Sequence, residues 1–284
     1  MSQKSVLITG TSEGGIGDAI AQEFHAQGLR VFASARDLKK IQHLADKGFD
    51  VIKLDVLDAQ SIAAAVEAIK TATNGKLDYL VNNAGSGYQS FLLDTDMDVA
   101  KKVFDLNVWS VIGMSQAFAP LLIAAQGTIV NISSISGKQS MPTFSAYGAS
   151  KAAVERLSQG MRHELSPFGV QTVNIITGVV KTNFHDNMVS LVVPESSIYY
   201  PIREEAADVV AERPGAMDRH VYAKVVVKQL LRPTKPAEIW AGGYTNPIWL
   251  LSTFLTAKFA DALLLRDSGM KNLSALGKVQ LKKS

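Results

Sequence analysis

Short apolar runs and stretches of helical periodicity alternate along most of the chain. The apolar runs are short enough to be buried strands, and they occupy residues 6–9, 31–33, 51–54, 79–81, 128–132, 170–176 and 238–241. Between them, apolar residues recur at helical spacing, as in Ile16, Ile20 and Phe24 after the first run. Strands that alternate with helices indicate βαβ units with right-handed crossovers and a parallel sheet. We therefore predict the α/β class, with one doubly wound parallel sheet covered by helices on both faces and with ligands beyond the carboxyl ends of its strands.

One long segment, residues 183–219, interrupts this alternation. It is polar and irregular, contains Pro194, Pro201 and Pro214, and follows the sixth strand. A long irregular segment at that edge of a doubly wound sheet is more typical of a substrate lid than of a linker. We therefore predict one catalytic domain over residues 1–246, which includes a lid at 183–219.

The C-terminal part of the chain departs from the pattern in a different way. Residues 247–265 are largely apolar but carry Lys258 and Asp261, which makes the segment marginal in length and too charged for a membrane-spanning helix. Three interpretations stay open: a helix packed on the body, a wall of the substrate tunnel, or an interfacial membrane helix. The basic tail that follows is more typical of a solvated tail than of a contact with an anionic membrane. We treat residues 247–284 as an apolar segment and tail outside the catalytic domain.

Composition excludes several classes of protein. The chain has 284 residues, an apolar content of 47% and a formal net charge of +3, which suits one globular domain and gives little support for nucleic-acid binding. The absence of cysteine excludes disulfides, thiolate metal sites and a cysteine nucleophile, and no residue set predicts another metal site. Because the first strand-like run begins at Val6, we expect no signal or transit peptide and a protein that faces the cytosol.

The pair Tyr147 and Lys151 is the strongest sign of chemistry in the chain. Residues four apart lie on one face of a helix, roughly 5–6 Å apart at Cβ. An ammonium beside a phenol favours the phenolate, so we expect Lys151 to lower the pKa of Tyr147 and let it exchange a proton near neutral pH. Ser134 ends an apolar run upstream and can hold a carbonyl oxygen against the phenol. Ser133 is the alternative, ranked second because adjacent residues of a strand point to opposite sides. Together, Ser134, Tyr147 and Lys151 predict a carbonyl/alcohol oxidoreductase.

A glycine-rich turn over residues 9–17 joins the first strand to the first helix. Glycines there let the backbone approach a pyrophosphate, and the helix N-terminus supplies N–H groups with a partial positive charge; a turn that serves packing only is the alternative. The second strand ends at Arg36, where many dinucleotide folds place an acid that binds the ribose 2′-hydroxyl. A guanidinium there favours a 2′-phosphate, so we predict NADP(H) rather than NAD(H), with a surface arginine as the alternative.

Together with the sequence Asn82-Asn83-Ala84-Gly85 and with Asn107, these motifs resemble the short-chain dehydrogenase/reductase family along nearly the whole domain. The resemblance implies a Rossmann-type fold and a catalytic set of Ser134, Tyr147, Lys151 and Asn107. Asn107 would shape the site and a proton-relay water, although a cap or kink of a helix is the alternative. Together with Arg36, the resemblance predicts that NADPH or NADP+ is bound by Gly10, Ser12, Gly15, Ile16, Gly17, Arg36, Asp55, Asn83, Ala84, Gly85, Tyr147, Lys151, Val180 and Thr182.

The chain departs from the family pattern at two places. The glycine turn is one residue longer than the usual Thr-Gly-x-x-x-Gly-Ile-Gly, so Glu13 or Gly14 is the insertion. Thr177-Gly178 stands where the family usually has Pro-Gly after the sixth strand. Because Val180 and Thr182 still occupy the positions that contact the nicotinamide carboxamide in the family, we expect cofactor binding to survive both changes.

A narrower resemblance involves residues 176–182, 194–199 and 222–224 and the apolar C-terminal segment. These resemble the fungal-type NADPH-dependent 1-acyldihydroxyacetone-phosphate reductases, which implies reduction of a ketone on a lipid phosphate at the surface of the endoplasmic reticulum and of lipid droplets. Similar lids occur in reductases of fungal secondary metabolism and in 17β-hydroxysteroid dehydrogenase-like enzymes. A polyketide or steroid-like ketone is therefore the alternative substrate, and a noncatalytic NADPH-sensing protein is a remote alternative.

The expected partners follow from these resemblances. We expect a hydrophobic small-molecule ketone as substrate, no nucleic acid, and a peripheral contact with membrane or lipid droplets through residues 247–265. The family resemblance implies a homodimer or homotetramer built on the helices that include residues 100–122 and 147–164.

Charged residues of the lid region leave two interpretations open. Arg203, Arg213 and Arg219 can pair with a substrate phosphate, but acidic residues are interleaved with them, so surface ion pairs fit equally well. His185, at the start of the lid, is more typical of a surface residue than of a catalytic base.

Overall fold

The computed structural model of the chain describes residues 3–207, 215–265, 270 and 272–273. Within these residues, a seven-stranded parallel sheet with the order β3-β2-β1-β4-β5-β6-β9 forms the centre of the molecule. Its strands are β1 (Ser5–Thr9), β2 (Arg30–Ala35), β3 (Asp50–Lys53), β4 (Tyr79–Asn82), β5 (Thr128–Ser134), β6 (Gln171–Thr177) and β9 (Glu238–Ala241). Each corresponds to one of the predicted apolar runs, so the prediction of a doubly wound parallel sheet is confirmed.

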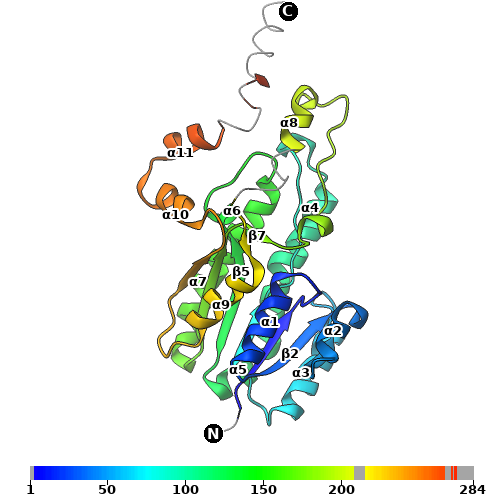
Figure 1. Cartoon of the computed structure of the whole chain (residues 1–284), viewed down its shortest axis with the longest axis vertical. Helices are drawn as coiled ribbons and strands as arrows, with labels where there is room; N and C mark the ends of the chain where they lie inside the picture. The colour runs from blue at the N-terminus through cyan, green and yellow to red at the C-terminus, as the bar shows by residue number, and fades with distance from the viewer. Residues whose placement is uncertain (1–2, 208–214, 266–269, 271, 274–284) are drawn as a thin grey trace, which may run out of the picture.

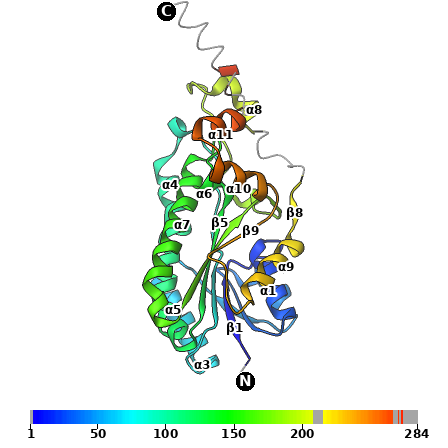
Figure 2. The ribbon, with the colours of Figure 1, turned by 90° about the vertical axis from the view of Figure 1, so that its left-hand side faces the viewer.

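Helices cover both faces of the sheet (Figures 1 and 2). One face carries α1 (Ile16–Ala26), α2 (Gln42–Ala45) and α9 (Arg219–Leu230), and the other carries α3 (Ala59–Ala72), α5 (Ser110–Ala125) and α7 (Ser145–Leu165). Alternate residues of β1 serve the two sides: Val6 and Ile8 belong to the core against α1 and α9, whereas Leu7 belongs to the core against α3 and α5. A strand buried on both faces explains why its sequence is a continuous apolar run and does not alternate.

The order of the strands places a crevice between β1 and β4. From β1 the chain proceeds to β2 and β3 on one side, and then returns to β4, β5 and β6 on the other. The turns that leave β1 and β4 therefore diverge at the carboxyl edge of the sheet, which is where doubly wound folds bind their ligands.

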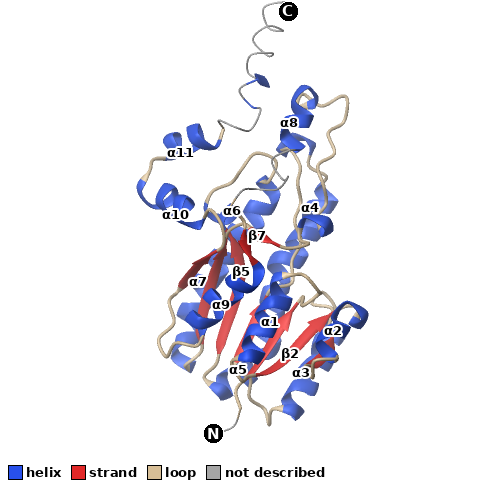
Figure 3. Cartoon of the chain, in the orientation of Figure 1, coloured by secondary structure: helices blue, strands red, loops and turns tan. Residues whose placement is uncertain are grey.

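Helices outside the regular βαβ units lie near the carboxyl edge of the sheet (Figure 3). They are η1 (Leu38–Ile41), η2 (Leu92–Asp94), α4 (Met97–Phe104), η3 (Asp105–Trp109), α6 (Ile135–Lys138), η5 (His185–Asn187), η6 (Tyr200–Ile202), α8 (Arg203–Ala207), α10 (Thr245–Phe254) and α11 (Ala257–Leu264); η4 (Ser166–Phe168) instead follows α7 directly. The short strands β7 (Val180–Lys181) and β8 (Met217–Asp218) pair in parallel at the base of the predicted lid. Phe91 and Tyr199 stack with ring centroids 4.1 Å apart, so the predicted lid packs on the segment that follows β4.

The apolar C-terminal segment is two short helices rather than one long helix. Ile248 of α10 is buried against Ile135 and Ile176, which attaches α10 to the body. Trp249 and Phe254 of α10 are exposed. The helical run Met97–Ala125 does have the length and hydropathy of a membrane span, but 44% of its apolar window is buried inside the protein, where α5 forms part of the core.

Candidate active site

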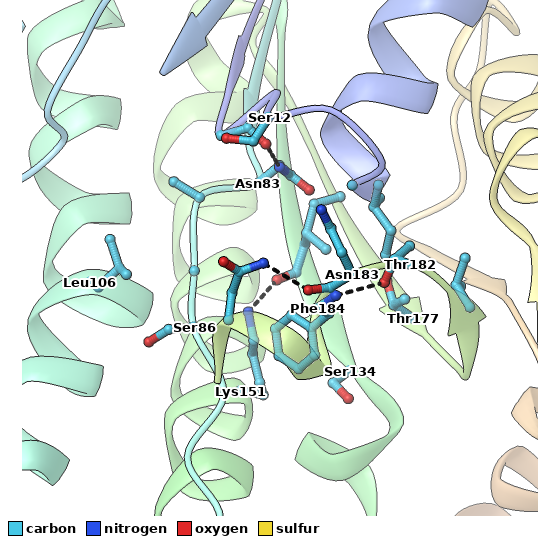
Figure 4. Close-up of a pocket in the computed structure, with 18 of the residues that line it drawn as sticks. Ser12, Asn83, Ser86, Leu106, Ser134, Lys151, Thr177, Thr182, Asn183 and Phe184 are labelled. Carbon is cyan, nitrogen blue, oxygen red and sulfur yellow. Dashed lines mark hydrogen bonds between the residues drawn. The ribbon is translucent and has the colours of Figure 1, made fainter. Parts of the chain in front are cut away.

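A cavity of about 650 Å³ opens at the carboxyl edge of the sheet. Figure 4 shows Ser12 and Asn83 at one end of this view, Lys151 and Ser134 at the other, and Asn183 and Phe184 between them. The cavity is lined by most of the predicted site residues, which are Gly10, Ser12, Gly15, Ile16, Arg36, Asn83, Ala84, Gly85, Ser134, Tyr147, Lys151, Val180 and Thr182. Segments from residues 10 to 187 therefore meet at one site.

The glycine turn after β1 is shaped for close contact with a ligand. Gly10 has φ +71°, and a Cβ at this position would lie 3.0 Å from the Cα of Ala84. The helix α1 begins at Ile16, and Gly15 before it provides no side-chain cap, so amides of the first turn remain available to an anion. A larger side chain at Gly10 would be strained and would press on the backbone of Ala84.

Thr9 holds this turn against the end of β4. Its hydroxyl oxygen accepts hydrogen bonds from the backbone N–H groups of Asn83, at 3.0 Å, and Ala84, at 2.9 Å. The side-chain amide of Asn83 donates to the carbonyl oxygens of Thr9, at 2.8 Å, and Gly10, at 2.9 Å. These bonds span the crevice between the two strands and fix one wall of the nucleotide end.

Two basic side chains line the nucleotide end of the cavity. Arg36 follows β2 as predicted, and Lys40 of η1 joins it. The sequence reasoning missed Lys40, although its position four residues after Arg36 was a usable signal. A backbone turn, a helix N-terminus and two cations together fit a dinucleotide that carries a 2′-phosphate. The residues present therefore suit the predicted cofactor.

Three predicted site residues do not line the cavity but support residues that do. At Gly17 a Cβ would clash with the side chain of Asn83 and the carbonyl oxygen of Gly10, so Gly17 allows close packing of α1. The carboxylate of Asp55 accepts from the backbone N–H of Leu57 at 3.0 Å, which orders the turn after β3.

Asn107 lies in η3, a π-helical turn, and is buried. Its Oδ1 accepts from the backbone N–H of Ser86 at 2.9 Å, and its Nδ2 donates to the Ser86 carbonyl and to the Ser150 hydroxyl, both at 3.0 Å. Asn107 therefore joins the loop after β4 to Ser150, the residue that precedes Lys151. It lies in an irregular helical turn, which fits the alternative interpretation of Asn107 as a cap or kink of a helix.

The catalytic candidates come together where β5 meets α7. The Ser134 hydroxyl acts on the buried Tyr147 phenol by lowering its pKa, and it accepts from the backbone N–H of Ser136 at 3.1 Å. The Lys151 ammonium lies 5.9 Å from the centre of the Tyr147 ring and donates to the carbonyl oxygen of Ile132 at 2.9 Å. Ser133 donates instead to the carbonyl oxygen of Lys151 at 3.0 Å, so its hydroxyl is engaged with α7.

Burial dominates the protonation of this pair. It raises the pKa of Tyr147 to about 12, with the Ser134 hydrogen bond acting in the opposite direction. Burial also lowers the pKa of Lys151 to about 8. Our expectation of a lowered pKa for Tyr147 is therefore not met, because loss of water raises this pKa. Tyr147 is held in the protonated form that can donate a proton.

Apolar side chains form the wall of the cavity beside Tyr147. The rings of Phe144 and Phe184 lie 6.2 Å and 6.1 Å from the Tyr147 ring, centroid to centroid, and Met141 completes this wall. The sequence reasoning missed all three, along with Asn183 and Asn187, which also line the cavity. Only Phe144, one helical turn before Tyr147, could have been found by spacing.

The basic residues of the lid region lie elsewhere in the structure. Arg203 donates to the carbonyl oxygen of Tyr200 and to the carboxylate of Glu204, both at 3.0 Å. Arg219 is the first residue of α9 and is not among the residues that line the cavity. Arg213 lies outside the described residues, and so does the side chain of His185.

Comparisons with known proteins identify the family of the chain. Residues 4–190 match the family model described as short chain dehydrogenase. A short-chain dehydrogenase of Talaromyces islandicus, cctT, is 39% identical over 96% of this chain and 98% of its own length. An NADPH-dependent 1-acyldihydroxyacetone phosphate reductase of Schizosaccharomyces pombe is 39% identical over 85% of this chain and 86% of its own length. The crystal structure of a short-chain dehydrogenase from Streptomyces avermitilis is 29% identical and covers 100% of this chain and 99% of its own, with a TM-score of 0.78. The chain belongs to the short-chain dehydrogenase/reductase family.

Proposed function

We propose that the chain reduces a ketone attached to a large apolar group, with NADPH as the reductant and 1-acyldihydroxyacetone phosphate as the substrate. The observation that carries the reductase assignment is the grouping of Ser134, Tyr147 and Lys151 in one cavity, whose far end carries Arg36 and Lys40. One cavity thus combines a proton donor with a site for a phosphorylated dinucleotide.

The chemistry divides between cofactor and protein. NADPH, when bound, supplies the hydride that reduces the carbonyl carbon. Tyr147 donates its phenolic proton to the carbonyl oxygen, and Ser134 holds that oxygen by a hydrogen bond. The Lys151 ammonium favours the phenolate that Tyr147 becomes after donation. A proton from solvent then restores the phenol.

The lipid phosphate is supported by the S. pombe relative and by the apolar wall. That relative is named for the reduction of 1-acyldihydroxyacetone phosphate. The wall of Met141, Phe144 and Phe184 can accept an acyl chain, because burying apolar carbon there releases water from both surfaces. The product would be 1-acylglycerol 3-phosphate.

One observation favours a second candidate, a phosphate-free ketone such as a polyketide or steroid-like compound. Among the described residues that line the cavity near Tyr147, Lys151 is the basic one, while Arg36 and Lys40 lie at the nucleotide end. A substrate phosphate next to Tyr147 would thus have few cations to pair with in the described part of the chain.

A matched set of ketones separates the two candidates. NADPH oxidation is measured with 1-acyldihydroxyacetone phosphate, with the same lipid lacking its phosphate, with dihydroxyacetone phosphate, and with steroid and polyketide ketones. Our proposal requires kcat/KM to fall when the acyl chain is removed, and also when the phosphate is removed. Equal rates with and without phosphate would reject the lipid phosphate and leave the second candidate. Absence of turnover with every ketone would reject the reductase itself.

We also propose that the exposed apolar residues of α10 and α11 contact a lipid surface on the cytosolic side of endoplasmic reticulum or lipid droplets. Trp249, Phe254 and Phe259 are exposed on these helices, and their burial in lipid would be favourable. Replacing all three with serine should abolish flotation with liposomes, whereas Phe168→Ser, an equally exposed aromatic after α7, should not. Flotation unchanged by the triple replacement would refute the contact.

The assembly proposed from the family resemblance is a homodimer or homotetramer through α5 and α7. Val111 of α5 and Val154 of α7 lie in one apolar cluster with Val108 of η3, and Trp109 of η3 is 56% exposed. Trp109→Lys should therefore shift the sedimentation coefficient to that of a monomer. A monomeric wild-type chain would refute the proposal directly.

A further inference from the structure

The extra residue in the glycine turn makes contacts on two sides. The backbone N–H of Glu13 donates to the carbonyl oxygen of Lys40 at 3.0 Å, and its own carbonyl oxygen accepts from the Asn183 side-chain amide at 2.8 Å. The backbone N–H of Gly14 donates to the carboxylate of Asp18 at 3.0 Å. The longer turn is therefore held at both ends and presents one carbonyl oxygen to Asn183.

Gly14 gives the Asn183 amide the room it needs. A Cβ at Gly14 would lie 3.3 Å from Asn183 Nδ2, tighter than an ordinary contact, and Gly14 has φ +79°, a conformation that favours glycine. The Glu13 carbonyl oxygen and the absence of a side chain at Gly14 therefore both favour the contact with Asn183.

Asn183 opens the predicted lid segment. Its own carbonyl oxygen accepts from the Asn187 side chain at 2.7 Å, which closes the short turn η5. The next residue, Phe184, forms the wall against Tyr147. Glu13, Asn183 and Asn187 all line the cavity, so the hydrogen bond from Asn183 to Glu13 joins the two sides of its mouth.

We propose that Asn183 and the Glu13 carbonyl form a latch that holds the start of the lid over the bound dinucleotide. The latch slows release of NADPH and sets Phe184 in place against Tyr147, so Asn183 is a positioning residue that acts through the lid. The latch deepens the proposed function. Its expected effect on ketone reduction rests on that function, whereas its expected effect on NADPH release depends only on binding of NADPH.

The latch predicts a specific division among the kinetic constants. A single neutral hydrogen bond has a modest net effect, so Asn183→Ala should raise the dissociation rate of NADPH about 3- to 10-fold. The KM for ketone should rise by a similar factor because Phe184 is no longer held. The value of kcat should stay within about twofold, since Ser134, Tyr147 and Lys151 are untouched.

The test measures NADPH release by stopped-flow fluorescence on the full chain, first without ketone and then alongside steady-state rates. Asn183→Ser serves as a second variant, because its hydroxyl is too short to reach the Glu13 carbonyl, and it should behave as Asn183→Ala does. Asp186→Ala, an exposed residue of the same turn that does not line the cavity, is the matched control and should release NADPH as the wild type does.

The outcomes are separable. Faster release in both Asn183 variants and not in Asp186→Ala supports the latch. Wild-type release in either Asn183 variant, or equal acceleration in the control, overturns it. If no ketone is reduced but NADPH release still depends on Asn183, the latch stands and the proposed reaction fails.

Discussion

The two ends of the cavity are built in different ways. The nucleotide end consists of turns that leave β1, β2 and β4, with Thr9, Gly10 and Asn83 tied together by hydrogen bonds. The substrate end consists of side chains such as Phe144 and Phe184 on segments that depart from the sheet. The first end is part of the sheet architecture and cannot change without disturbing it. The second can vary while the fold persists, which is why one fold serves many substrates.

The largest expected effect concerns the residue at the boundary between the two ends. Tyr147→Phe removes the proton donor and should lower kcat for ketone reduction about 10³-fold, within the range for general acid catalysis. The affinity for NADPH, measured by fluorescence titration, should change less than about twofold because the nucleotide end is intact.

Tyr79→Phe is the matched control. Tyr79 is also buried, has a pKa raised to about 12, and donates its hydroxyl to the carbonyl oxygen of Leu230, away from the cavity. It should retain wild-type kcat. Near-normal turnover in Tyr147→Phe, or an equal loss in Tyr79→Phe, would refute the catalytic assignment.

Adjacent serines at the end of β5 provide the next comparison. Ser134→Ala removes the group that holds the carbonyl oxygen and should lower kcat about 10²-fold. Ser133→Ala removes a hydrogen bond to α7 and should lower the free energy of unfolding by about 1 kcal/mol while kcat stays within about threefold. Parallel measurements of kcat and urea unfolding test both statements, and a reversed order would assign the role to Ser133.

The nucleotide end is tested by its preference between cofactors. Arg36→Ala should lower kcat/KM for NADPH about 10- to 50-fold and leave the value for NADH nearly unchanged, because only NADPH carries the 2′-phosphate. Lys40→Ala should act in the same direction with a smaller effect. Lys39→Ala, which removes the neighbouring charge that does not line the cavity, should leave the preference intact. Equal decreases in kcat/KM with NADPH and NADH would show that Arg36 supports the fold and does not bind the 2′-phosphate.

The sequence predicted the nucleotide end better than the substrate end for physical reasons. The strands were visible because Val6, Leu7 and Ile8 are buried on both faces of the sheet. Ser134, Tyr147 and Lys151 were identified because helical and strand spacing is short-range geometry. Phe184 and Asn183 were not, since their positions depend on how a long excursion returns to the cavity. The direction of the Tyr147 pKa shift was also missed, because spacing reports a nearby charge but not the loss of water.

The pKa of Lys151 makes the rate of ketone reduction depend on pH. Because burial lowers this pKa to about 8, the ammonium is present below that pH and is lost as the pH rises through it. Tyr147, with a pKa of about 12, stays protonated over the same interval. We therefore expect kcat/KM for the ketone at saturating NADPH to fall about tenfold per pH unit above the Lys151 pKa. A profile that stays flat to about pH 10 would contradict a role for the Lys151 charge.

The smallest expected effect lies at the substrate end, where Phe184→Ala should raise the KM for a long-chain ketone about 5-fold. The replacement removes apolar area from the wall beside Tyr147, so the loss should grow with the apolar size of the ketone and vanish for a small diketone. The NADPH affinity should stay within about twofold, since Asn183 keeps its hydrogen bond to Glu13. Phe168→Ala, at an exposed aromatic residue after α7, is the control and should change neither constant. A KM increase independent of ketone size would mean that Phe184 supports the lid and does not contact the substrate. Phe184 would then not be one of the side chains that distinguish the substrate end from the nucleotide end.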